Sequence, residues 1–165
     1  MEAERLIATG RHALAQSRDA LDVVAEAWQA QALAQALGGR LALHGPQELR
    51  GEARGLCEAG ARGCGPLDHP CGGVPRAAQL SEVSDLQKAL TGLSTLLGEV
   101  GIALVGVACA TDEEGLYWQC IEAIDAADES NDRVRALLRR LSLRDRTRPR
   151  DPDRLHPPDP ATSPP

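Results

Sequence analysis

The chain of 165 residues carries 24 acidic and 18 basic side chains, a net charge of −6, and only 2% aromatic residues. Its net negative charge argues against nucleic acid as a partner, and hydrophobic residues dominated by Ala and Leu argue against an extensive sheet. This length suits one domain. We expect an all-α protein with a helical domain over residues 1–144 and a disordered tail, rich in Pro, Arg and Asp, over residues 145–165.

A first helical segment is predicted from about Glu2 to Leu43. Apolar residues recur there at intervals of seven, which would hold one seam against a partner helix: Ile7, Leu14, Leu21 and Trp28. Its place on this seam predicts that Trp28 belongs to the core. The pattern leaves open whether the seam is filled within the chain or by a second copy, so a homodimer is one interpretation. Gly38-Gly39 is expected to bend or end the helix.

The second helical segment follows a turn, with Pro46 at a first-turn position where its missing N–H costs nothing. Apolar and small residues at helical spacing continue to about Arg62. A loop dense in Gly and Pro is then predicted over residues 63–75.

The third segment, over residues 76–110, keeps apolar side chains at helical spacing for most of its length. Gly98, Gly101 and Gly106 are interpreted as positions where a neighbouring helix approaches closely. A strand over residues 102–108 is the alternative. The most apolar run, residues 100–110, is about half the length that a bilayer span requires, so no membrane segment is expected.

The fourth segment begins with a helix-capping pattern and predicts the last helix. In Thr111-Asp112-Glu113-Glu114, Thr111 can accept from the third amide of the helix while Glu114 reaches back to the cap. Helical spacing then continues to Leu141. Four amphipathic segments with short connections predict an antiparallel four-helix bundle.

The stretch from Glu113 to Asp128 holds the only Tyr and one of the two Trp. At 100° per residue Cys120 falls on the apolar face and Tyr117 at its margin, whereas Trp118 points the other way, among carboxylates. Cys120 is therefore predicted to be core, and Tyr117 is predicted to bury its ring while its hydroxyl reaches water or a carbonyl. Trp118 either covers the edge of the bundle or is an exposed anchor for a partner.

Charge is strongly segregated along the fourth segment. Residues 111–130 contain seven acids and no base, whereas residues 131–150 contain eight Arg and two Asp. The helix macrodipole favours this order near the two helix ends, and a docking surface for a protein partner is the functional alternative. The candidate contact residues are Trp118, Glu114, Glu122, Asp125, Glu129, Arg139, Arg140 and Arg144.

Cysteines recur at intervals of seven before and within the predicted loop, at Cys57, Cys64 and Cys71, with His69 beside the last. Two thiols and an imidazole could form a metal- or thiol-responsive sensor. The spacing does not match the close ligand pairs of zinc sites, so no metal and no cofactor are expected, and the sensor remains the alternative function.

No catalytic motif, P-loop or dinucleotide-binding pattern is present, so we do not expect an enzyme, although a site between helices needs no linear motif. The N-terminus lacks the apolar stretch of a signal peptide, which favours a cytoplasmic protein. The expected function is therefore protein–protein interaction, as an adaptor or regulatory accessory protein.

Several stretches carry a resemblance to a known family: "ELRGEARGLCEAG", "GCGPLDHP" and above all "TDEEGLYWQCIEAIDAADESNDRVRALLRRL". They resemble a protein family of unknown function from Streptomyces and related actinobacteria. The resemblance covers roughly Met1 to Leu141. It implies a bacterial, cytoplasmic setting and no particular activity.

Overall fold

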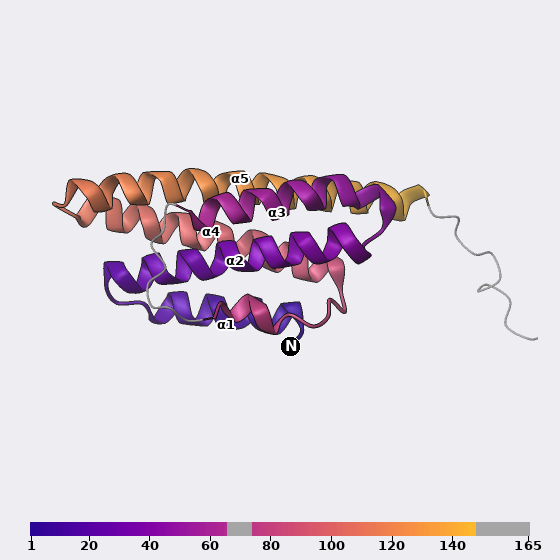
Figure 1. The fold of residues 1–165 in the computed structure, drawn as a ribbon, viewed down its shortest axis with the longest axis horizontal. Coiled ribbons are helices and arrows are strands. Elements are labelled where there is room, and N and C mark those ends of the chain that lie inside the picture. Colours follow the sequence, from indigo (N-terminus) through magenta and orange to yellow (C-terminus); the bar gives the residue numbers. More distant parts are fainter. Residues whose placement is uncertain (66–73, 148–165) are drawn as a thin grey trace, which may run out of the picture.

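The computed structural model describes residues 1–65 and 74–147, and in these ranges the protein is all-helical, as predicted (Figure 1). The prediction of a disordered tail from residue 145 is wrong for residues 145–147, because they belong to the last helix. The rest of the predicted tail, from residue 148, and the part of the predicted loop over 66–73 lie outside the described residues. The helices are α1 (Ala3–Gln16), α2 (Ala20–His44), α3 (Arg50–Cys64), α4 (Leu86–Ala110) and α5 (Glu114–Thr147), with short 3-10 turns η1 (Gln47–Leu49) and η2 (Arg76–Gln79). Five α-helices in these ranges replace the four predicted segments.

The first predicted segment is two helices, because the chain leaves helical geometry after Gln16. Ser17 is extended, and Asp19 (φ −128°, ψ 171°) caps α2 by accepting a hydrogen bond from the Asp22 amide at 2.9 Å. The four residues at intervals of seven therefore lie on two separate helices, and the prediction that they form one continuous seam is wrong. Trp28 is core, as predicted, but Leu21 is 73% exposed.

The contact between α2 and α3 is made close by glycines. A Cβ on Gly38 would lie 2.5 Å from the backbone nitrogen of Cys57, and one on Gly60 would lie 2.5 Å from that of Gln35. The helix does not end at Gly38-Gly39, which was one of the two expectations for this pair, since α2 continues to His44. Gly38 instead lets α3 pack directly against the α2 backbone.

The third predicted segment begins ten residues later than expected, because Asp85 caps α4 through the Lys88 amide at 2.9 Å. Residues 76–79 form only the turn η2, and residues 102–108 are helical rather than a strand. The interpretation of the α4 glycines is also wrong. A Cβ on Gly98, Gly101 or Gly106 would meet nothing within 4 Å.

The apolar character of α4 extends over its 25 residues, well beyond the eleven considered from sequence. Among the described residues, α4 is the one helix long and apolar enough, by length and composition, to cross a membrane. The core helix of a soluble protein meets the same two criteria, and α4 places Leu90, Leu97 and Leu104 in the core with at most 1% exposure.

The helices pack side by side around a core of Leu and Ala. Helix α2 packs against α3, α4 and α1, and α5 packs against α4 and α3 along one edge of the molecule (Figure 1). Residues spaced by seven on α5 supply its buried face: Cys120, Ala127, Val134 and Leu141. Helix α5 continues past the predicted end at Leu141 to Thr147, so its opposite face forms a long outer surface.

Candidate protein-contact surface

The start of α5 differs in detail from the predicted capping box. The helix begins at Glu114, and the Thr111 hydroxyl accepts from the Glu113 amide at 3.1 Å, within the turn that joins α4 to α5. The first helical bond runs from the Tyr117 amide to the Glu113 carbonyl at 3.0 Å. The cap thus forms two residues later than the sequence suggested.

Trp118 and Tyr117 lie together on the surface near this start. Their rings meet edge to face with centroids 5.3 Å apart, and Trp118 is 56% exposed. The prediction that Tyr117 buries its ring is wrong, since Tyr117 is 41% exposed. Such aromatic pairs support one another, so the indole is held in place without being covered. Cys120, one turn later, is fully buried and belongs to the core, as predicted.

The predicted acidic residues occupy two different environments. Glu114, Glu122 and Asp125 are exposed. Glu129 is only partly exposed and forms an ion pair with Arg62 of α3, so it also ties α5 to the bundle. The acidic surface available to a partner is therefore concentrated in the first turns of α5.

The predicted arginines divide in a similar way. Arg140 forms an ion pair with Glu52 of α3 at 3.2 Å, and Arg133 approaches the same carboxylate at 3.8 Å. Arg139 is exposed and Arg144 is partly exposed, and within the described residues neither has an ion-pair partner. The structure thus brings Arg140 to α3 and leaves Arg139 facing outward.

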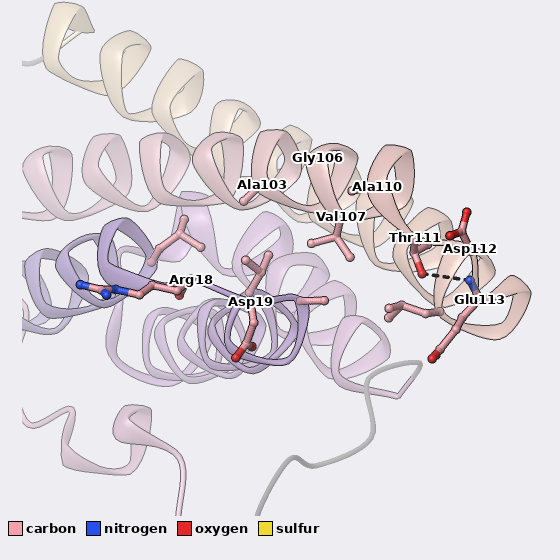
Figure 2. Close-up of a pocket in the computed structure, with 14 residues that line it drawn as sticks. Arg18, Asp19, Ala103, Gly106, Val107, Ala110, Thr111, Asp112 and Glu113 are labelled. Carbon is pink, nitrogen blue, oxygen red and sulfur yellow. Dashed lines mark hydrogen bonds between the residues drawn. The ribbon is translucent and has the colours of Figure 1, made fainter.

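A groove of about 670 Å³, which sequence reasoning missed, lies between the connection of α1 to α2 and the turn from α4 to α5 (Figure 2). Its wall is largely apolar, with Val107 projecting into it in Figure 2. Acidic residues Asp19, Asp112 and Glu113 contribute to the lining, against one basic residue, Arg18. The lining has no His or Cys, so the groove suits an apolar group with a cationic neighbour better than acid–base chemistry.

The groove could not have been predicted from periodicity, because its lining comes from two stretches far apart in the chain, residues 14–23 and 103–116. The lining residues are Leu14, Ser17, Arg18, Asp19, Ala20, Val23, Ala103, Gly106, Val107, Ala110, Thr111, Asp112, Glu113 and Leu116. The sequence does contain one signal for this region. Asp19 followed three residues later by Asp22 is typical of a helix N-terminus, and it would have predicted that a new helix begins here.

The predicted sensor residues do not form a site in the described part of the chain. Cys57 and Cys64 lie on α3, whereas His69 and Cys71 lie outside the described residues. Among the described residues, no three His, Cys, Asp or Glu side chains are placed to hold a metal ion. Burial raises the pKa of the Cys64 thiol, which disfavours the thiolate that metal binding and redox chemistry need.

Sequence reasoning also missed a buried polar contact between α2 and α5. The Ser130 hydroxyl donates to the Gln31 side-chain oxygen at 2.8 Å, and both residues are almost fully buried. Within residues 1–65 and 74–147, the Gln31 side-chain nitrogen has no hydrogen-bond partner. Gly63 packs against this amide, where a Cβ would lie 2.5 Å from the Gln31 side chain.

The comparison with family models covers nearly the same residues as the resemblance seen in the sequence. No curated protein and no solved structure matches the chain. A model of a family of unknown function, DUF6099, matches residues 1–140, which include helices α1 to α4 and most of α5. The chain therefore belongs to this family of unknown function, DUF6099.

Proposed function

We propose that this protein acts by binding another protein through its α4–α5 end, defined as the C-terminal half of α4 from Gly98, the turn, and α5 as far as Asp125. The observation that carries the proposal is Trp118, 56% exposed beside Tyr117 and surrounded by carboxylates. Trp and Tyr are enriched among the residues that dominate binding energy at protein interfaces. An adaptor or regulatory accessory protein would use such a surface.

Other exposed apolar residues support the proposal that this end of the molecule is the contact surface. Ile102 and Val105 on α4 join the two aromatic residues, so this end holds four of the nine large hydrophobic side chains exposed in the described ranges. Ile102, at 76%, is among the most exposed of them. Concentrated exposed apolar side chains mark an interaction surface better than scattered ones.

Charge defines the chemistry of the partner. From Thr111 to Ser130 the chain has seven acids and no base, so a complementary segment would present basic side chains around an apolar one. The mixed groove beside the turn, apolar in its wall and acidic at its rim, fits the same description. We expect binding to weaken as salt concentration rises.

Capture from lysate of the source organism tests this proposal. We expect Trp118→Ala to reduce capture of a specific protein at least about tenfold, because truncating a central aromatic anchor removes most of its contacts. Leu43→Ala is the matched control, since Leu43 is a large apolar side chain, 71% exposed on α2, that lies outside the α4–α5 end. A chain ending at Thr147 tests the tail without cutting α5.

Circular dichroism must show that Trp118→Ala unfolds at the same denaturant concentration as the wild type. Equal capture by the wild type and Trp118→Ala would then contradict the proposal. A loss seen only when the chain ends at Thr147 would move the contact to the residues beyond α5.

A further inference from the structure

Helix α5 has a second regular stripe, which faces away from the core. Residues at alternating spacings of three and four follow one line along the helix, and they are exposed except for the partly buried Ile121. They are Trp118, Ile121, Asp125, Asp128, Asp132, Arg135, Arg139, Ser142 and Arg146, with Leu143 beside them. We call this set the outer stripe. In Figure 1 helix α5 runs along one edge of the molecule.

The order of charges along the outer stripe lowers the stability of a helix that has no partner on this face. Residues four apart carry like charges in both halves, at Asp128 with Asp132 and at Arg135 with Arg139. Such pairs repel one another, whereas alternating signs would attract. The macrodipole does not explain the order, because its effect is confined to the first and last turns and Asp128 lies more than three turns into α5.

Few of these charges are neutralised within the chain. Asp132 and Arg135 approach one another at 3.9 Å. Within the described residues, Asp125, Asp128 and Arg139 have no ion-pair partner. An outside surface with the opposite order of charges would offset the repulsion along both halves.

The outer stripe is complementary to itself when it is reversed. Taking Asp132 as the centre, residues at equal distances on either side are Asp125 and Arg139, then Ile121 and Leu143. The next equidistant pair is Trp118 and Arg146, an indole and a guanidinium, which attract when they stack. An antiparallel copy would therefore set Asp125 against Arg139, Ile121 against Leu143 and Trp118 against Arg146 on both sides of the axis.

We infer that the partner of this surface is a second copy of the chain, bound with its α5 antiparallel along the outer stripe and with the two-fold axis near Asp132. The inference rests on the proposed function and names its partner. Each Asp125 faces Arg139 of the second copy, and each Trp118 faces Arg146 of the second copy. At the axis the two Asp132 carboxylates meet, each already beside an arginine of its own chain.

Sedimentation equilibrium of the full chain, at low and high salt, tests this arrangement. We expect a dimer at low salt that dissociates as salt screens the ion pairs. Asp125→Arg alone, or Arg139→Asp alone, places like charges opposite one another twice in each dimer, so each variant should raise the dissociation constant at least about tenfold.

Charge reversal also provides a rescue that a merely destabilised chain cannot show. Mixing the Asp125→Arg chain with the Arg139→Asp chain restores both ion pairs in a heterodimer, and placing both changes in one chain restores the homodimer. Glu58→Arg and Arg54→Asp, on the exposed face of α3, make the same charge changes away from the outer stripe and should leave the dimer intact.

A wild-type chain that stays monomeric at low salt overturns the inference, as do single variants that dimerise like the wild type or mixtures that show no rescue. These results are separable from failure of the proposed function. A monomeric chain whose Trp118→Ala variant still loses a captured protein would exclude the second copy and keep the contact surface. A chain that dimerises with rescue, and captures nothing else, would identify the second copy as the partner.

Discussion

The α2–α3 contact and the C-terminal half of α4 are both rich in glycine, yet the glycines have different structural roles. On α2 and α3, Gly38 and Gly60 sit where a Cβ would collide with the neighbouring backbone. On α4, Gly98 and Gly101 have open space where a Cβ would be. The first pair makes a tight contact within the chain, whereas the second weakens a helix without a packing benefit inside the chain.

The difference shows why small residues cannot be assigned from sequence spacing alone. Both regions contain glycine at helical positions, and the spacing on α4 suggested the closer approach. Only the position of the neighbouring backbone distinguishes a glycine that is required from one that a larger residue could replace.

The largest effect should come from adding one methyl group to the tight contact. We expect Gly38→Ala to lower the free energy of unfolding by about 1–3 kcal/mol, because its Cβ would overlap the α3 backbone, which cannot move aside as a flexible side chain can. Urea unfolding followed by circular dichroism measures this. Gly39→Ala is the matched control, since its Cβ would lie at an ordinary 3.5 Å from the Cys57 sulfur. Equal stability of the two variants would contradict the prediction.

The opposite sign is expected on α4. Gly98→Ala should raise the free energy of unfolding by about 0.5–1 kcal/mol, because alanine loses less backbone freedom on folding and meets no neighbour here. The same urea measurement applies. A loss of stability would mean that something packs on this glycine in the folded protein.

The smallest effect concerns Glu99, in the same half of α4. Its carboxylate accepts hydrogen bonds from Arg11 of α1, at 2.6 and 2.9 Å, and these bonds lower its pKa. A lowered pKa in the folded state stabilises the protein above the ordinary Glu range, and this contribution is lost as the pH falls through the lowered value. Glu99→Gln should therefore be slightly less stable than the wild type at neutral pH and equal to it in strong acid.

Unfolding midpoints measured across that pH range, at low salt, test the prediction. Both side chains are more than a third exposed, so salt should reduce the difference. A difference between the two proteins that persists at strongly acidic pH would contradict the assignment to this ion pair.

Sequence periodicity predicted the helical class and the burial of Trp28 and Cys120, because each lies on an apolar stripe. It missed the break at Asp19, since the apolar spacing continues across the cap as if the helix did. It also placed Leu21 in the apolar seam, although Leu21 is 73% exposed in the structure. The groove escaped prediction for a related reason, as its lining is assembled from segments that only the folded chain brings together.

The segregated charges of α5 also bear on how quickly molecules meet. At 1.5 Å per residue, its 34 residues separate an acidic start from a basic end by about 50 Å. A molecule polarised in this way turns in the electric field of a charged neighbour before the surfaces touch, so a larger share of collisions begins in a productive orientation. The rate of association should therefore fall steeply with ionic strength, while the rate of dissociation changes far less.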